Sequence, residues 1–157
     1  MKDKAQQIID SLDLRAHPEG GFFREIFRSE QTVEWQGETL CAGTAIYFLL
    51  LDGDRSWCHR IPQDEVWQFF EGDPFELVFF HENDLQLQRI VLSDSNRTFV
   101  VPGGAWQAAR TRGDYSLIGC TVSPGFEFRL FELLAAVPEK QQLFYDGVDG
   151  LKKFEAP

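Results

Sequence analysis

The spacing of apolar residues changes once along the chain, from a helical period near the N-terminus to the shorter runs of a β-rich body. Ile8, Ile9 and Leu12 recur at helical spacing, so the pattern predicts a short amphipathic helix over residues 5–12. The segment HPEGG at residues 17–21 ends this helix, because proline and paired glycines favour a turn. The strand-like run FFREIFRS follows directly.

Short apolar runs separated by turn residues dominate the rest of the chain. Predicted strands cover residues 22–29, 44–50, 66–70, 76–80, 85–92, 98–101 and 115–121. The connecting segments LDGD, EGDP, HEND and SDSN carry the residues that tight turns prefer. The tail predicts one more strand in FEFRLFELL (126–134) and a short helix over 139–144. Many short strands with a helix at each end indicate an all-β sandwich or barrel.

Length, composition and charge narrow the class of protein. A chain of 157 residues with 43% hydrophobic residues is the size of one domain with a substantial core. Its formal charge of -10 argues against nucleic acid as a partner, because binding to phosphate backbones needs clustered Lys and Arg. The charged N-terminal segment and the absence of a long apolar run predict no membrane segment and a cytoplasmic location.

The segment GDRSWCHRIPQDEVWQFFEG at residues 53–72 contains the strongest sequence motif. Its frame runs from Gly53 through five residues to His59, then Ile61, Glu65 and, after six residues, Gly72. This frame resembles the first motif of the cupin superfamily, in which a second histidine stands at the position of Ile61. The resemblance implies that one ligand position of a metal-bearing cupin is lost.

A second frame lies between residues 96 and 111. Pro102 and Gly104 match the second cupin motif, whereas Asn96 replaces its first glycine. Gln107 stands where that motif has its histidine, and Thr111 stands where it has an asparagine. A second ligand position is therefore altered.

Longer phrases are similar to a branch of small single-domain cupins of unassigned function. They are HPEGGFFRE, TAIYFLL, DEVWQFFEGDPFEL, VPGGAWQAA and IGCTVSPGFEF, which span residues 17 to about 131. The resemblance implies an all-β double-stranded β-helix, the jelly-roll or cupin barrel, with a short N-terminal and a short C-terminal helix. We expect a single domain over 1–157 with a barrel core over about 21–134, a homodimer, and a small-molecule pocket inside the barrel.

The resemblance raises the question of a metal. Metal-bearing cupins surround a divalent ion with three imidazoles and a carboxylate, so each lost ligand weakens binding. Here His59 and Glu65 remain, and the amide oxygen of Gln107 is a weak ligand for zinc or iron. We therefore expect no cofactor, with a divalent metal held through His59 and Glu65 as the alternative.

His59 is the candidate catalytic base, because an imidazole titrates near neutrality and a carboxylate such as Glu65 can orient it or the substrate. Cupin epimerases use a histidine with a tyrosine as acid partner, for which Tyr47 and Tyr115 are both candidates. The competing interpretation of His59 is a structural residue at a strand edge. A buried Glu65 needs a cationic partner, or its pKa rises. Candidate partners are Arg24, Arg60 and Arg110.

Three functions follow from these residues. The first is a metal-independent isomerase or epimerase acting on a small polar metabolite such as a sugar derivative, with His59 and Glu65 as catalytic residues. The others are a non-catalytic small-molecule-binding module and a metal-dependent cupin with an incomplete ligand set. The residues predicted to bind the ligand are Arg24, Tyr47, Trp67, Trp106 and Gln107. Alternation predicts that Glu65, Trp67 and Phe69 share one face of their strand.

Overall fold

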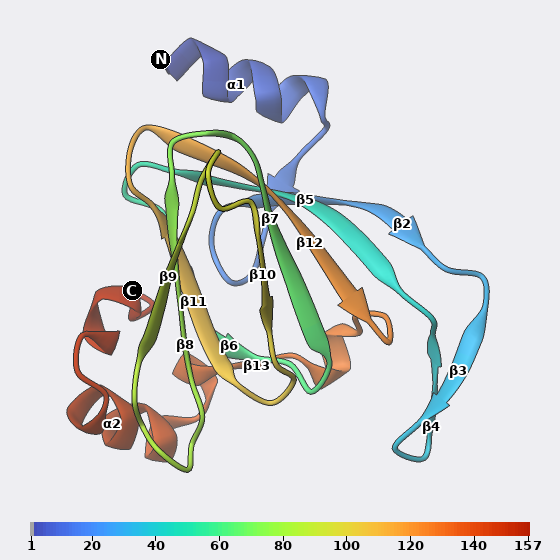
Figure 1. Cartoon of the computed structure of the whole chain (residues 1–157), viewed down its shortest axis with the longest axis vertical. Helices are drawn as coiled ribbons and strands as arrows, with labels where there is room; N and C mark the ends of the chain where they lie inside the picture. The colour runs from blue at the N-terminus through green and yellow to red at the C-terminus, as the bar shows by residue number, and fades with distance from the viewer. Residues whose placement is uncertain (1) are drawn as a thin grey trace.

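The computed structural model describes residues 2–157 and is built from antiparallel β-sheets with a helix near each end of the chain (Figure 1). The first sheet contains, in order, β1 (Arg15–Ala16), β2 (Phe22–Arg28), β5 (Thr44–Leu51), β12 (Tyr115–Ser123), β7 (Asp64–Gly72) and β10 (Thr98–Val101). The second contains β13 (Glu132–Leu133), β6 (Ser56–Arg60), β11 (Trp106–Thr111), β8 (Phe75–Phe80) and β9 (Gln88–Leu92). A separate hairpin of β3 (Thr32–Trp35) and β4 (Glu38–Cys41) projects from one end.

The main core lies between the two large sheets. Strand β7 shows how the sequence builds it, because side chains alternate between the two faces of a strand. Trp67 is fully buried and Phe69 is 3% exposed, whereas Phe70 on the other face is 41% exposed. Glu65 is buried on the inner face as well. The predicted alternation of β7 is confirmed, and it places a carboxylate inside the barrel.

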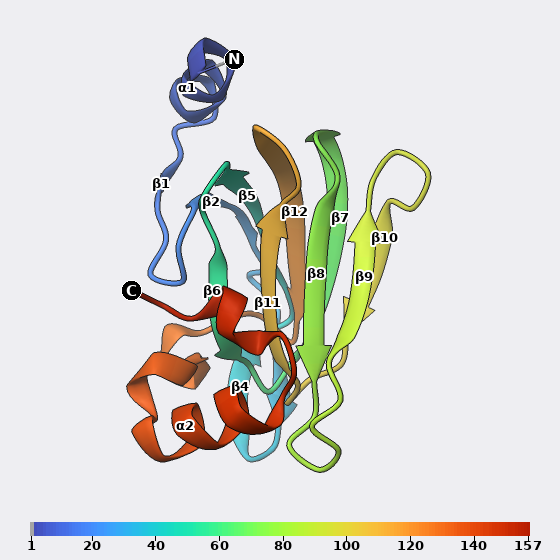
Figure 2. The ribbon, with the colours of Figure 1, turned by 90° about the vertical axis from the view of Figure 1, so that its left-hand side faces the viewer.

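Helices cover parts of the outer surfaces of both sheets. Helix α1 (Lys2–Ser11) places Ile8 against Leu49 and Leu117 at one end of the first sheet. Helix α2 (Pro138–Gly147) and the 3-10 turn η3 (Leu151–Phe154) cover the second sheet, where the ring of Phe144 lies 5.8 Å from that of Trp106 (Figure 2). Among the described residues, no helix has the length and apolar character to cross a membrane.

The predicted strand over residues 126–134 is wrong. This segment instead forms the 3-10 turn η1 (Phe128–Leu130), the two-residue strand β13 and the 3-10 turn η2 (Leu134–Ala136). Its aromatic side chains at 126, 128 and 131 all face one cavity, which strict alternation in a strand would not allow. Strands β6 and β11 were not predicted, because SWCHR and WQAART contain few β-branched residues.

A buried carboxylate ties β8 to its neighbours. Glu76 is 3% exposed and accepts hydrogen bonds from Arg110 Nε at 2.8 Å and Arg89 at 2.9 Å. Burial opposes its ionisation, but these two hydrogen bonds outweigh burial and lower the pKa of the Glu76 carboxyl. Strands β8, β9 and β11 are therefore joined by side chains as well as by backbone pairing.

We expect Glu76→Gln to lower the free energy of unfolding by about 2 kcal/mol at pH 7, because hydrogen bonds to a charged group are lost. The folded pKa of Glu76 lies below its ordinary value of 4.5, so its stabilisation is present above that pH and is lost as the pH falls through the folded pKa. Urea denaturation at pH 7 and at low pH measures the difference. Glu71→Gln, which changes an exposed carboxylate, is the control, and an equal loss in both variants contradicts the prediction.

Candidate functional site

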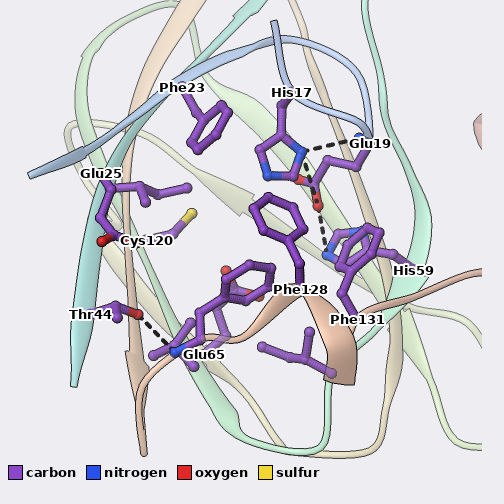
Figure 3. Close-up of a pocket in the computed structure, with 14 residues that line it drawn as sticks. His17, Glu19, Phe23, Glu25, Thr44, His59, Glu65, Cys120, Phe128 and Phe131 are labelled. Atoms are coloured by element: carbon purple, nitrogen blue, oxygen red, sulfur yellow. Dashed lines mark hydrogen bonds and ion pairs between the residues drawn. The ribbon is translucent and has the colours of Figure 1, made fainter. Parts of the chain in front are cut away.

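A cavity of about 40 Å³ opens at the end of the barrel where the first sheet, β6 and the segment after β12 meet (Figure 3). Its polar lining contains two histidines, three glutamates, a threonine and a cysteine, and its apolar lining is mainly phenylalanine. The lining residues are His17, Glu19, Phe23, Glu25, Thr44, Ile46, His59, Ile61, Glu65, Cys120, Val122, Phe126, Phe128 and Phe131. Buried titratable groups in an apolar cavity are a common form of catalytic site.

His59 projects from β6 into this cavity with a defined tautomer. Its Nδ1 lies 2.8 Å from the backbone oxygen of Trp57, and because a carbonyl can only accept, Nδ1 carries a proton. Nε2 lies 3.2 Å from Oε2 of Glu19. The imidazole stacks on the ring of Phe131, with centroids 5.3 Å apart. His59 is 2% exposed, so its free edge faces Glu19 and the cavity rather than bulk water.

Glu19 reaches His59 from the turn between β1 and β2. Its Oε1 accepts a hydrogen bond from the Ser56 hydroxyl at 2.7 Å, and the Trp57 backbone N–H donates to its carbonyl oxygen at 2.6 Å. Burial raises the pKa of the Glu19 carboxyl and lowers the pKa of His59. Both shifts favour the uncharged pair, in which the protonated carboxyl donates to Nε2. Glu19 and His59 therefore share one proton at the cavity wall.

His17 lies beside this pair as a neutral base. The backbone N–H of Glu19 donates to its Nδ1 at 3.0 Å, so the ring proton is on Nε2. The ring packs edge-to-face on Phe23 at 4.5 Å. Burial lowers the pKa of His17, although the nearby Glu19 carboxyl acts to raise it. The side chain consequently adds a ring N–H, and no charge, to the polar part of the wall.

Glu65 enters from β7 on another side of the cavity, as Figure 3 shows. Its Oε2 accepts a hydrogen bond from Nε2 of Gln107, and Gln107 Oε1 accepts one from Trp67 Nε1 at 2.9 Å. Burial raises the pKa of Glu65 to about 7, because the opposing effects of His59 and the Gln107 hydrogen bond compensate only in part. A carboxyl with this pKa exchanges protons readily at neutral pH.

The arginines considered as partners for Glu65 are engaged elsewhere. Arg60 pairs with Glu132 and Glu82, Arg110 pairs with Glu76, and Arg24 donates to the backbone oxygen of Leu12. We predicted that a buried Glu65 without a cationic partner has a raised pKa. Burial does raise the pKa of Glu65.

The side chains around Glu65 do not fit the ligand set of a metal-bearing cupin. The oxygen of Gln107 already accepts a hydrogen bond from Trp67, and Ile61 presents only hydrocarbon at the position of the second histidine. Within residues 2–157, no group of three or more His, Cys, Asp or Glu side chains is arranged to hold a metal ion.

The structure brings together only part of the predicted site. His59 and Glu65 line the same cavity, and Gln107 reaches it through its hydrogen bond to Glu65. Trp67 is fully buried behind Gln107 and does not line the cavity. Trp106 lies on the outer face of the second sheet, where it packs against α2 and donates to Glu82.

Arg24 and the two candidate tyrosines also lie away from the cavity. Arg24 is exposed and binds the end of α1. Tyr47 packs under α1 and against Phe70, whose ring centroid is 6.0 Å away, and the Tyr115 hydroxyl donates to Glu71. Strand alternation turns these side chains outward, since Tyr47 and Phe48 point to opposite faces of β5. Neither candidate tyrosine is among the residues that line the cavity, and the side chain beside His59 is Glu19.

Sequence reasoning missed His17, Glu19 and the aromatic cluster formed by Phe126, Phe128 and Phe131. The phrase HPEGG contains two of these polar groups, but its glycines identified it only as a turn. The aromatic cluster falls in a segment whose pattern predicts a strand. A histidine and a glutamate beside paired glycines were the available signal, and only the fold shows that they face the cavity.

Comparison with known proteins shows which family and which solved structures this chain resembles. A family model described as Cupin superfamily (DUF985) matches residues 6–134. A hypothetical protein from Leishmania major is 29% identical, with a TM-score of 0.86 over 98% of this chain and 99% of its own. A protein from Shewanella oneidensis is 32% identical, with a TM-score of 0.84 over 98% of each chain.

More distant structures share the fold alone. The capsular polysaccharide assembling protein CapF from Staphylococcus aureus is 14% identical, with a TM-score of 0.56 over 72% of this chain and 30% of its own. No protein with a curated description matched the chain. The expected double-stranded β-helix is confirmed by these likenesses and by the mostly antiparallel β architecture. The chain belongs to the cupin superfamily, in the family described as DUF985.

Proposed function

We propose that this cupin is a metal-independent isomerase or epimerase that moves a proton on a small polar metabolite. One observation carries the proposal: the Glu19–His59 pair and Glu65, whose pKa is about 7, line the same mainly apolar cavity. A reaction of this type needs one group to remove a proton and another to return one. The cavity provides both.

The proposed step conserves protons and electrons. His59 Nε2 takes a proton from a C–H bond next to a substrate carbonyl, so the C–H bond breaks and an N–H bond forms. The Glu65 carboxyl gives its proton back at a different face or atom, so its O–H bond breaks and a new C–H or O–H bond forms. The proton shared with Glu19 leaves to solvent when substrate binds, which frees the Nε2 lone pair, and the Glu19 carboxylate then stabilises the imidazolium. After the product leaves, His59 gives up its extra proton and solvent returns protons to Glu65 and Glu19.

Sugar derivatives are the first substrates to test, because CapF, which shares the fold, is described as a capsular polysaccharide assembling protein. We would incubate the protein in D₂O with aldoses, ketoses, amino sugars and their phosphates and follow deuterium incorporation by NMR. Protein-dependent exchange supports catalysis, whereas a bound but unexchanged compound identifies the non-catalytic binding module instead. Exchange that requires an added divalent metal contradicts the metal-independent mechanism.

The initial exchange rate should fall as the pH rises through about 7. Glu65 must be protonated to return a proton, and deprotonation above its pKa of about 7 removes the active form, about tenfold per pH unit at high pH. Glu65→Gln should exchange slowly at every pH and lose this dependence. A wild-type rate that increases through pH 7 contradicts the role given to Glu65.

A further inference from the structure

The charged residues that line the cavity are of one sign. Glu19, Glu25 and Glu65 contribute carboxyl groups, and the residues described at the lining include no Lys or Arg. Arg28 pairs with Glu25, but a bound phosphate or carboxylate would meet Glu19 and Glu65 without a Lys or Arg partner, which makes its burial costly. A cationic ligand would instead pair with an ionised Glu19 and leave Glu65 able to hold its proton.

Aromatic rings form the part of the lining that adjoins the two histidines, since Phe131 stacks on His59 and the ring of Phe128 lies 5.9 Å from that of His17. Phe126 and Phe128 meet edge-to-face with centroids 4.8 Å apart and planes at 85°. Phe131 lies 6.1 Å from Phe126 and 6.3 Å from Phe128, at 66° and 71°. Three rings set at steep angles to one another present π-faces in different directions. His59 already covers one face of Phe131, so the faces left for a cation belong mainly to Phe126 and Phe128, and the negative face of such a ring attracts a cation.

Arg28 and Thr44 hold the aromatic cluster at one end. The Arg28 guanidinium donates to the Phe126 carbonyl at 3.0 Å and to Glu127 at 3.1 Å, and makes two hydrogen bonds of 2.9 Å to Glu25. The Thr44 hydroxyl oxygen accepts from the Phe126 N–H at 3.0 Å. Because Arg28 is occupied by a carbonyl and by two carboxylates, one of them the lining residue Glu25, its charge is already paired and Glu25 adds no unpaired charge to the cavity.

We propose that the cavity binds a small organic cation, with its ammonium group between the aromatic cluster and the carboxyl group of Glu19. The inference rests on the proposed function and narrows its substrate class to an amine that carries neither phosphate nor carboxylate. Phe128 is 51% exposed, so its ring forms the mouth of the site and meets an entering cation first.

Choline and two carbon analogues of it serve as test ligands, because they have similar branched shapes but different charges. Dimethylbutanol replaces the quaternary nitrogen of choline by carbon, and dimethylbutanoate adds a negative charge to the same branched group. Isothermal titration calorimetry at pH 7.5 should give affinities in the order choline, dimethylbutanol, dimethylbutanoate, with about tenfold or more between the first two. Equal affinity for choline and dimethylbutanol, or preference for the anion, overturns the inference.

Substitutions at the mouth test the π-face directly. Phe128→Leu should weaken choline binding about threefold to tenfold and change dimethylbutanol binding less than about twofold, while Phe128→Tyr restores choline binding. Because Phe128 is half exposed, these variants should keep the wild-type melting temperature. Glu30→Gln removes an exposed charge outside the cavity and should leave choline binding unchanged.

The choline-binding test and the deuterium-exchange test can give negative results independently of each other. Choline binding without deuterium exchange into any substrate supports the cation site and removes the isomerase proposal. Exchange into a sugar phosphate without choline binding overturns the cation site and leaves the isomerase proposal in place.

Discussion

His59→Asn is expected to lower the rate of deuterium incorporation by at least about 100-fold, because proton transfer by a positioned side chain contributes about that much or more. The lone pair of Nε2 is the proposed base, and Nδ1 is held by the Trp57 carbonyl so that Nε2 faces the cavity. An amide cannot accept and release a proton at neutral pH. The measurement is the initial exchange rate by NMR, made with a substrate that exchanges with wild type.

The fold of the His59→Asn variant must be checked independently, because the residue is buried and its loss leaves Glu19 without that partner. A cooperative thermal transition followed by circular dichroism, together with retained ligand binding, would show that the barrel persists. His81→Asn is the matched control, since His81 is exposed and lies outside the cavity. Turnover that continues unchanged in His59→Asn rejects the assigned base.

Gly20→Ala should lower the free energy of unfolding by about 3 kcal/mol or more. Gly20 has φ +95, and an added Cβ would stand 2.0 Å from the backbone oxygen of Arg55. Backbone cannot yield as a flexible side chain can, so the turn must move away from β6. Because the adjacent Glu19 depends on this turn to reach Ser56 and His59, the variant should also lose exchange activity.

Gly37→Ala separates backbone strain from the steric clash. Gly37 has φ +80, and nothing lies within 4 Å of the position that an added Cβ would take. Its replacement should therefore cost about 1 kcal/mol, the cost of left-handed backbone alone, and leave activity unchanged. Urea denaturation measures the free energy of unfolding of both variants. Equal losses of this free energy would mean that the close approach of Gly20 to the Arg55 backbone contributes little to the cost of Gly20→Ala.

The candidate site differs from the one that the cupin motifs imply. His59 and Glu65 occupy motif positions, but the partner of His59 is Glu19, which comes from a turn that lies before both motifs. Ile61 and Gln107 replace two imidazoles of a metal centre, and Gln107 holds Glu65 by an amide hydrogen bond. In the proposed function, protein groups carry the proton transfer at the position where the resemblance to metal-bearing cupins implies a metal.

Sequence pattern predicted the local structure of most strands well. The strand at residues 98–101 is observed with the same bounds, and Glu65, Trp67 and Phe69 share one face of β7 as predicted, because alternation along a strand is a local property. The FEFRLFELL segment was misassigned for the same reason. Its apolar residues suit a strand locally, but they are recruited to a cavity whose other walls are far away in sequence.

The sequence by itself indicated the cupin architecture, the shared face of Glu65, Trp67 and Phe69, and His59 as a candidate base. Only the tertiary structure decided that Glu19 pairs with His59, that Trp106 and Tyr47 face outward, and that the aromatic cluster covers the cavity. Periodicity reports which residues share a face of one element. Which faces then meet depends on pairing between strands distant in the chain, and a single sequence does not encode those contacts in any local pattern.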